Sequence, residues 1–554
     1  MNSNNKQRPG AGKPLQAWVA WSAWSACLAG LSVVMPPAAW AQAPATAAPS
    51  TGPEVQVQRY EVEGNTLLTA AELQATLKPY EGAANLQRLK DAAAAVQDLY
   101  RSAGYGGVVA FVPEQSLGAG VVRIRVVEGR LARVDVADNK QFSTANILAS
   151  LPALQVGRTP QVRVIDAQIQ IANENPAKTV QVLLQPGAEP GSIAAKLTVA
   201  EQPVQRWTAR VDNTGGKRPG RWRAALGWQH ANLFDADHVA GVELQTAPEQ
   251  PSAVAVLSGS YRVPLYGQAL AIDAYGAYSD VDAGKIGTQI GDLQFSGKGT
   301  IVGTRLNAYL PRIGNIDQRA SLGLEWRDYL NNCAIEGLPQ GACGTAGASV
   351  SVQPLNLGYA AQAAGEIRWA FSINLLRNLA LGGRYGAASD FEAVRPGSRR
   401  GYTLLRSNGQ ASTALTDWLG IAVRYSAQFS DRALVPGELF GIGGAQSVRG
   451  FEERELGGDS GAQLTVEATG PKLGENWGGE IRPIAFADAG YVANRQGDPC
   501  LPGQSHCRMG ALGIGLRAAW PQAQLRLDLA RAMSTASTTH KGDGRLHVGL
   551  SVNF

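Results

Sequence analysis

The C-terminal segment Arg545-Leu-His-Val-Gly-Leu-Ser-Val-Asn-Phe554 alternates apolar and polar side chains without a break. The segment Gln524-Leu-Arg-Leu-Asp-Leu529 does the same, with three leucines on one face and Gln, Arg and Asp on the other. A period of two predicts β-strands with one apolar and one polar face. Segments of about ten residues with this pattern, separated by Gly, Asp, Asn and Pro turns, continue from about Gln205 to the C-terminus.

The composition narrows the fold class. The chain has 554 residues, of which 45% are hydrophobic, 17% are charged and 65 are glycine. Its mean hydropathy is −0.12, and no apolar run of about 20 residues lies beyond the N-terminal region, which excludes a helical membrane protein. A soluble β-sandwich also alternates, but about 350 residues is long for one sandwich, and the polar faces carry many charges. We therefore predict a transmembrane β-barrel.

Counting the alternating segments predicts a mainly β fold with a 16-stranded antiparallel barrel, an even number as bacterial barrels require. The long segment 429–460 then falls outside the cell, and the short connections containing VPLYG, PRIGN and Trp520-Pro521-Gln522 fall on the periplasmic side. The predicted strands are 206–213, 221–230, 237–247, 252–262, 268–279, 290–310, 317–330, 355–374, 378–387, 400–411, 417–428, 461–470, 479–491, 509–519, 522–531 and 544–554.

The N-terminus has the order of a secretory signal peptide, predicted to span residues 1–41. Lys6, Arg8 and Lys13 precede an uncharged stretch, and Ala39-Trp40-Ala41 offers a cleavage site. A membrane anchor is the alternative, although the stretch is rich in Trp, Ser and Pro. Removing three cations and no anions lowers the net charge from +5 to +2, so the basic balance indicates no nucleic-acid partner.

Two small α/β modules are expected ahead of the barrel. After a Pro- and Ala-rich linker at 42–54, residues 55–129 follow the order β-α-α-β-β, and Thr69-Ala-Ala-Glu72 is a capping box that begins the first helix. Residues 130–204 follow the same outline more faintly, which indicates an internal duplication. The barrel is expected over 205–554.

Four cysteines remain after cleavage, in two close pairs, Cys333 with Cys343 and Cys500 with Cys507. In an exported protein this spacing favours two local disulfides over a zinc site. The five histidines are scattered, and no HExxH or GxSxG motif is present. We therefore predict no catalytic residue, cofactor or metal. An outer-membrane hydrolase is the enzymatic alternative, and only lumen carboxylates favour it.

Two short motifs carry a family resemblance. The long loop 429–460 contains Val448-Arg449-Gly450-Phe451, and Phe486-x-Asp488-x-Gly490 stands two predicted strands later. Together with the two modules, they resemble the TpsB transporters of two-partner secretion, the ShlB/FhaC/HecB-like haemolysin secretion/activation proteins of the BamA-related superfamily. The first module is similar to a POTRA domain at Gly64-Asn65 and Gly104-Tyr105, and at Tyr100 and Gly129.

The resemblance implies that the loop folds into the lumen as a hairpin and that Arg449 pairs with Asp488. Alternation agrees, because it places Asp488 on the face opposite Ala485, Ala487 and Ala489. Without the motifs, the residues alone favour the alternative that Arg449 is a solvated loop charge and Asp488 an ordinary lumen residue. Gly549, Val552 and Phe554 are similar to the C-terminal signal read by the barrel assembly machinery; the alternative is an ordinary last strand.

The implied function is export of an unfolded exoprotein (haemolysin-, adhesin- or toxin-like, β-helical after secretion) by type Vb secretion, with possible activation. The protein would lie in the outer membrane of a Gram-negative bacterium as a monomer, contacting outer-membrane lipid, with its POTRA domains in the periplasm. An outer-membrane assembly factor and a passive porin are the alternatives. The short stretch 42–54 leaves no room for the plug helix of many relatives, so we expect none.

Overall fold

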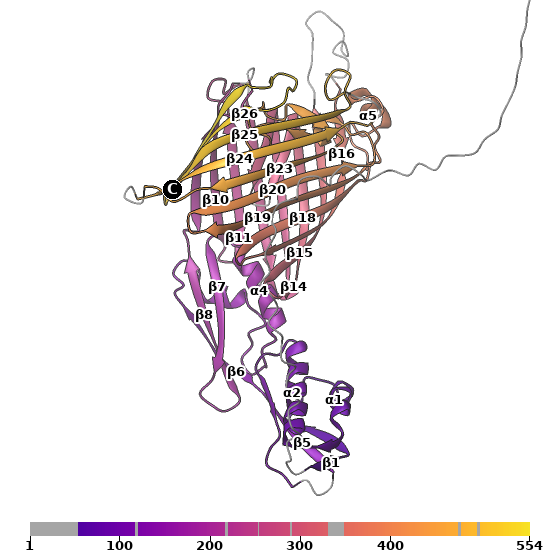
Figure 1. Ribbon diagram of the computed structural model, residues 1–554, viewed down its shortest axis with the longest axis vertical. Coiled ribbons are helices and arrows are strands. Elements are labelled where there is room, and N and C mark those ends of the chain that lie inside the picture. The colour runs from indigo at the N-terminus through magenta and orange to yellow at the C-terminus, as the bar shows by residue number, and fades with distance from the viewer. Residues whose placement is uncertain are drawn as a thin grey trace, which may run out of the picture. The chain divides into compact units, whose positions relative to one another are not determined.

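The structure is a computed structural model that describes residues 54–116, 120–216, 220–252, 254–288, 291–330, 348–474, 478–495 and 499–554, without the side chains of 281–297. The predicted signal peptide and most of the linker, 1–53, lie outside the described residues. So do Cys333 and Cys343. Figure 1 follows the chain from the two α/β modules into the barrel.

The first module contains a three-stranded sheet and two helices. Strand β2 (Arg59–Glu63) pairs in parallel with β5 (Val121–Glu128), which pairs antiparallel with β4 (Val108–Phe111). The helices are α1 (Ala70–Leu77), opened by the predicted Thr69–Glu72 capping box, and α2 (Leu86–Ser102). The predicted strand over 55–63 is interrupted: β1 (Val55–Val57) pairs instead with a strand missed in the sequence, β3 (Gly82–Ala84).

The second module repeats this sheet order. Strand β6 (Arg130–Ala137) pairs in parallel with β8 (Ser192–Glu201), which pairs antiparallel with β7 (Lys178–Pro186). Helices α3 (Thr144–Ala149) and α4 (Val162–Asn173) lie between β6 and β7 in the chain. Apolar side chains of both helices and the sheet, including Leu131, Ile147, Ile165 and Leu197, form its core. The shared topology supports a duplication.

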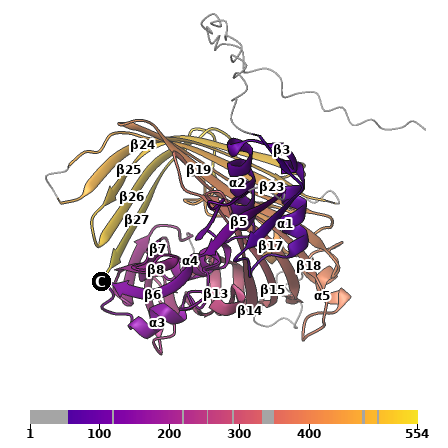
Figure 2. The same ribbon diagram turned by 90° about the horizontal axis from the view of Figure 1, so that it is seen from below.

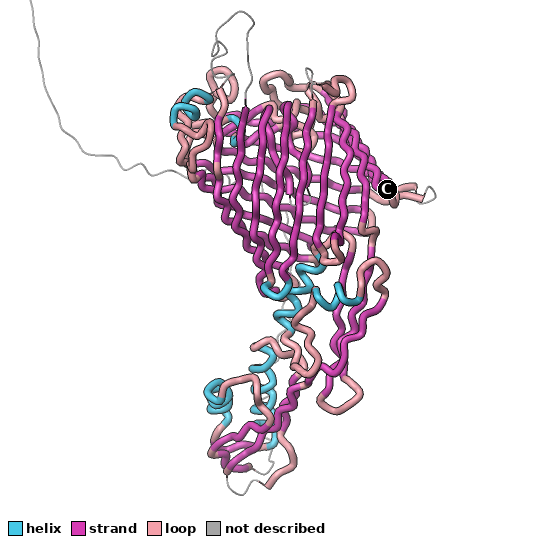
Figure 3. Tube along the Cα trace, turned by 180° about the vertical axis from the view of Figure 1, so that it is seen from behind, coloured by secondary structure: helices cyan, strands magenta, loops and turns pink. Residues whose placement is uncertain are grey.

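The remaining strands close into one antiparallel barrel with sixteen strand positions around its wall, as predicted. Figure 3 shows this wall of strands in magenta. The short strands β16 and β17 follow one another at a single strand position, because both pair with β15. The strands are β9 (Gln205–Asp212), β10 (Arg223–Leu233), β11 (His238–Thr246), β12 (Ala255–Leu265), β13 (Leu270–Thr288), β14 (Gly291–Ile313), β15 (Ile316–Leu330), β16 (Val350–Val352), β17 (Pro354–Ala363), β18 (Ile367–Asn378), β19 (Thr403–Thr416), β20 (Leu419–Ser430), β23 (Ser460–Thr469), β24 (Glu480–Ala493), β25 (His506–Ala519), β26 (Ala523–Ala532) and β27 (Gly544–Asn553).

Two predicted strands are wrong, and the errors cancel in the count. The segment 355–374 is two strands, β17 and β18, joined by a turn at 364–366. The segment 378–387 is not a strand, because Gly382 and Gly383 adopt φ values of 100° and 107° that turn the chain away from the sheet. It begins a long loop, 379–402, that carries α5 (Ala388–Val394).

Strand alternation gives the wall its two faces. On β26 the side chain of Leu529 is 54% exposed, whereas that of Asp528, one residue earlier, is fully buried inside the barrel. The lumen carries most of the ion pairs, and the outer face carries Leu, Ile, Val and aromatic side chains. None of the helices in the described part of the chain is long and apolar enough to cross a membrane.

The second module is joined to the barrel by buried polar contacts. Helix α4 packs against β14 (Figure 2). Lys178 at the start of β7 donates to Asp237 in the β10–β11 turn at 2.5 Å, and both side chains are essentially unexposed. Tyr266 donates to the same carboxylate at 2.6 Å. A charge with no access to water is stable only when paired, so this contact fixes the module at the barrel mouth.

Candidate transport site

The loop 429–460 forms a hairpin whose limbs pair through β21 (Phe440–Ile442) and β22 (Leu456–Gly458). At its turn, Arg449 reaches Asp488 on β24: its Nε and Nη2 donate to the two carboxylate oxygens at 2.7 and 2.9 Å. The backbone N–H of Arg449 donates to the same carboxylate at 3.1 Å. Arg449 is 1% exposed. A bidentate pair of this kind fixes direction as well as distance.

Further charged residues, not predicted as site residues, surround Arg449. Arg449 lies 3.2 Å from Glu467 on β23 and 3.5 Å from Asp528 on β26. Arg517 on β25 contacts both carboxylates, at 3.2 and 2.7 Å. Arg526 also binds Asp528 and donates to the backbone carbonyl of Ala445 in the hairpin at 2.8 Å. Arg424 on β20 lies 3.8 Å from Glu467 as well, so three acids and four guanidinium groups meet within the lumen.

The motif around Asp488 completes the binding site of the hairpin turn on the barrel wall. We call this site the seat of the hairpin tip. The guanidinium carbon of Arg449 lies 3.3 Å from the ring centre of Phe486, a cation–π contact. A Cβ atom added at Gly490 would lie only 2.8 Å from Val448 Cγ2. Any larger residue there would push the hairpin away from β24. Phe486, Asp488 and Gly490 therefore share the lumen face that alternation predicted for Asp488.

The neighbours of Arg449 in the hairpin are also held. Gly450 has φ +92° and its N–H donates to Nε2 of His547 on β27 at 3.0 Å. The imidazole must therefore be neutral with its hydrogen on Nδ1. Val448 and Phe451 are fully buried against an apolar group that includes Val492 and Met509. The sequence alone does not predict this role of His547, because its contact with the hairpin depends on strand register.

The residues singled out in the first module hold a turn. Gly64 and Gly104 have φ values of 88° and 99°. Asn65 accepts from the backbone of Leu68 at 3.0 Å and from the Tyr100 hydroxyl at 2.5 Å. The Tyr105 ring lies 6.4 Å from that of Tyr100, edge to face. These contacts tie the β2–α1 turn to α2.

Glu128, at the end of β5, completes this arrangement. Its carboxylate accepts from the Thr66 and Leu67 backbones at 2.7 and 3.1 Å and from Tyr100 at 2.9 Å. Burial opposes ionisation of Glu128, but the hydrogen bonds outweigh it and hold the pKa of its carboxyl below the usual value. The segment Val126-Val127-Glu128-Gly129 thus holds the turn through its glutamate.

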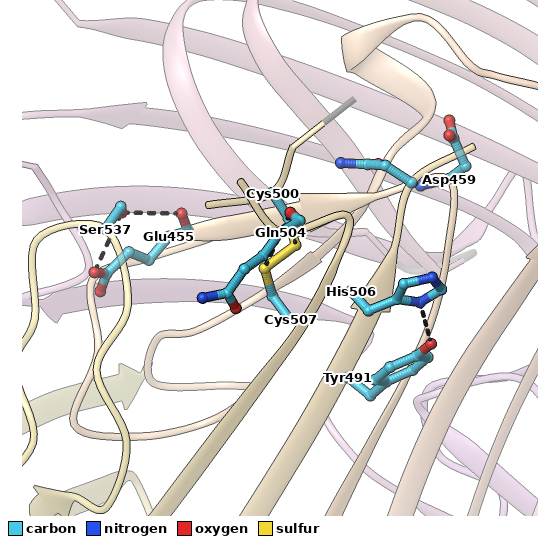
Figure 4. The surroundings of a disulfide bond; sticks show 9 residues. Glu455, Asp459, Tyr491, Cys500, Gln504, His506, Cys507 and Ser537 are labelled. Atoms are coloured by element: carbon cyan, nitrogen blue, oxygen red, sulfur yellow. Dashed lines mark hydrogen bonds between the residues drawn. A yellow bond between two sulfur atoms is a disulfide. The ribbon is translucent and has the colours of Figure 1, made fainter. Parts of the chain in front are cut away.

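The cysteine prediction is tested at one pair. Cys500 and Cys507 form a disulfide beside the hairpin (Figure 4). Among the described residues no group of three His, Cys, Asp or Glu side chains is arranged to hold a metal ion.

The C-terminal residues lie on the closing strand. Gly549 and Val552 pair with Asp212 and Ala209 of β9. Phe554 exchanges backbone hydrogen bonds with Trp207 at 2.8 and 3.0 Å, and its side chain is 64% exposed. An exposed terminal aromatic suits the membrane interface.

A cavity of about 640 Å³ lies in the lumen between α4 and the hairpin. Its lining is dominated by carboxamide and hydroxyl groups, contributed by α4, the wall and the hairpin. Its charged members include paired residues, such as Glu174 with Arg319 at 2.9 Å and Arg312 with Asp317 at 2.7 Å. Its carboxamide and hydroxyl groups come from Gln170, Asn173, Tyr309, Gln318, Gln362, Ser372, Asn408, Gln410, Tyr425, Ser426, Gln446, Gln463 and Thr465.

A closed barrel with two α/β modules at its mouth and a hairpin pinned inside its lumen defines an outer-membrane transporter of the two-partner secretion class. The profile of the haemolysin secretion/activation proteins ShlB/FhaC/HecB matches residues 191–517, and that of the ShlB-type POTRA domain matches 55–129. The chain belongs to the ShlB/FhaC/HecB family. Its barrel lies in the outer membrane and its POTRA domains in the periplasm.

Individual relatives agree. The chain is 26% identical over 473 residues to the outer membrane transporter CdiB of Escherichia coli O6:K15:H31, covering 83% of this chain and 76% of the relative. Identity to CdiB of Dickeya dadantii is 23% over 466 residues, with coverage of 80% and 76%. The solved structure of CdiB from Escherichia coli superposes with a TM-score of 0.74 at 21% identity, covering 92% of this chain and 93% of that chain.

Proposed function

We propose that this chain recognises one large, unfolded partner protein in the periplasm and passes it through the barrel lumen to the cell surface. The observation that carries the proposal is the lumen hairpin. Its turn is held by Arg449 on Asp488, within a cluster of paired charges in the lumen. Residues 1–41 act as signal peptide and 42–54 as linker. The functional parts are POTRA 1 (55–129), POTRA 2 (130–204) and the barrel (205–554).

Recognition in the POTRA domains uses an exposed sheet edge. Strand β4 is an edge strand of its sheet, and β7 is an edge strand in the second domain. Val109 and Phe111 on β4 are 55% and 41% exposed, and Leu183 on β7 is 60% exposed. An extended chain can pair with such an edge through its backbone, while apolar side chains select its sequence.

The lumen cavity supports passage of an extended chain. Its carboxamide and hydroxyl groups can exchange hydrogen bonds with any backbone, and its paired charges present little net field to the passing side chains. The chain needs no cofactor and performs no catalysis in this account. It works as a monomer, and folding of the partner outside supplies the direction of movement.

The adjacent reading frame provides the test. We expect a large neighbour with its own signal peptide and β-helix repeats. Deleting the transporter should leave this neighbour in the periplasm, and supplying the transporter again should return it to the medium. Unchanged export would contradict the proposal. A general loss of outer-membrane barrels would favour the assembly-factor alternative, and an effect on small solutes alone would favour a porin.

A further inference from the structure

The hairpin is held at a second place, far along its limbs from Arg449. We define the hairpin tip as 443–454 and the hairpin base as 431–442 with 455–460. The tip is bounded by backbone conformations suited to a hinge: Gly443 and Gly444 have φ values of 108° and 103°, and Arg454 has 51°. The N–H of Arg454 donates to the carbonyl of Gly443 at 3.2 Å, which closes the tip at this point.

Glu438 fastens the base to the barrel wall. Its side chain is fully buried. One carboxylate oxygen accepts from Arg327 at 2.7 Å and from Tyr329 at 2.8 Å, both on β15. The other accepts from Arg406 on β19 at 3.0 Å. A fully buried carboxylate with three donors cannot leave them without a large cost in desolvation.

Asp459 fastens the other limb to the loop that carries α5. It is also fully buried, and it accepts from Arg395, the residue after α5, at 2.6 and 3.1 Å. The backbone N–H groups of Leu434 and Arg495 donate to the same carboxylate at 2.7 and 2.8 Å. Asp459 thereby joins both limbs of the base to two neighbouring loops.

An apolar core reinforces these contacts. Leu434 and Val435 are fully buried against Phe391 and Val394 of α5. On the opposite side, Glu455 accepts from the backbones of Thr538 and Thr539 in the last loop at 2.7 and 2.8 Å, next to Ser537 (Figure 4). The base is therefore attached to wall and loops on several sides, whereas Gln446 in the tip lines the lumen cavity.

We propose that Glu438 and Asp459 are positioning residues that keep the hairpin base on the barrel while the tip alone leaves its seat to admit the partner. This inference rests on the proposed function. After the tip leaves, Glu467 and Asp528 keep Arg517 as a counter-charge, and Asp528 keeps Arg526. Asp488, on the lumen face, is the acid of this cluster that gives up the three Arg449 donors. Release of the base would instead separate two fully buried carboxylates from Arg327, Arg406 and Arg395 at once, and it would uncover the apolar core at α5. Hence a passage opens beside a fixed base, and the hairpin does not leave the barrel as one body.

Two buried reporters distinguish these movements in the full-length transporter. Ala445→Cys reports on the tip and Val435→Cys on the base, since these residues are 8% and 0% exposed. Cells are treated with a membrane-impermeant maleimide. The parent chain, without the introduced cysteine, gives the background labelling. Heat-modifiable migration in a gel shows that each variant has folded. In an Arg449→Ala background, which needs no partner, we expect fast labelling at 445 and none at 435. The same contrast is expected while the neighbour's product is being secreted.

The base variants complete the test. Glu438→Gln and Asp459→Asn should speed labelling at 435 by at least about 100-fold, because each removes the charge of a buried pair. Glu392→Gln, an exposed carboxylate on α5, is the matched control and should change nothing. Equal labelling at 435 and 445 after Arg449→Ala, or no effect of the base variants, would overturn the inference. Absence of secretion by the unaltered transporter would instead contradict the proposed function.

Discussion

Arg449 on the hairpin tip binds Asp488 on β24 through three N–H groups, its Nε, its Nη2 and its backbone amide. The two residues are 39 positions apart in the chain, and the contact fixes the tip against the inner wall. This relationship holds the hairpin tip inside the lumen by one defined contact.

Gly490 should be intolerant of a side chain. A Cβ atom there would meet Val448 Cγ2 at 2.8 Å and Ile442 Cδ1 at 3.1 Å, so Gly490→Ala should displace the tip and raise the conductance of the reconstituted channel. Gly510→Ala, on the neighbouring strand, is the matched control, because the nearest atom to its Cβ would be 3.8 Å away. Equal conductance of the two variants would show that the tip does not need the close approach.

His547 should hold the tip as a hydrogen-bond acceptor. His547→Phe replaces the imidazole by a phenyl ring, which fills similar space but has no acceptor. The Gly450 N–H then loses its partner, at a cost of about 1–3 kcal/mol. We expect faster maleimide labelling of Ala445→Cys in this variant. His547→Gln retains an acceptor oxygen and should label more slowly than His547→Phe. If Ala445→Cys is labelled at the same rate with and without His547→Phe, His547 does not help to hold the tip.

Strand alternation in the sequence was enough to predict the barrel and the lumen face of Asp488, because period and sidedness are local properties. The predicted number of sixteen strands is right only because two errors cancelled. The turn at 364–366 was missed since the segment Ala363-Ala-Gly-Glu-Ile367 offers only a weak turn signal. The segment 378–387 was mistaken for a strand because its apolar residues alternate, although two glycines bend it. Glu467 and Asp528 were visible as lumen acids, but their approach to Arg449 depends on the register of neighbouring strands.

The joint between POTRA 2 and the barrel should depend on charge pairing. Burial lowers the pKa of Lys178, and the adjacent Asp237 opposes this shift. Lys178→Met leaves Asp237 buried without its counter-ion, which should destabilise the joint by about 3–5 kcal/mol. We expect faster protease cleavage between the domain and the barrel, near Gln202–Val204. Adding Asp237→Asn should restore resistance, since Asn also accepts the left-handed backbone of φ 60° found there. Continued sensitivity of the double variant would contradict this account.

POTRA 1 should lose a stabilising contribution on acidification. The pKa of Glu128 is lowered in the folded state, so its contribution is fully present above the unfolded carboxyl pKa and disappears as the pH falls through the lower, folded value. Glu128→Gln should therefore make POTRA 1 more sensitive to limited proteolysis at neutral pH than the parent. In strong acid, below the folded pKa, the parent and variant should behave alike. A difference that persists there would indicate a role of Glu128 other than its charge.

The central claim is that Arg449 and Asp488 act as one unit in transport. The most direct measurement is the amount of partner secreted by Arg449→Ala, Asp488→Ala and the double variant, at equal outer-membrane abundance of folded transporter. We predict that each single variant lowers secretion and that the double variant is no worse than either, because both remove the same contact. Arg449→Lys should not restore secretion, because an ammonium cannot make the bidentate contact. Secretion at the parent level in both single variants would contradict the claim.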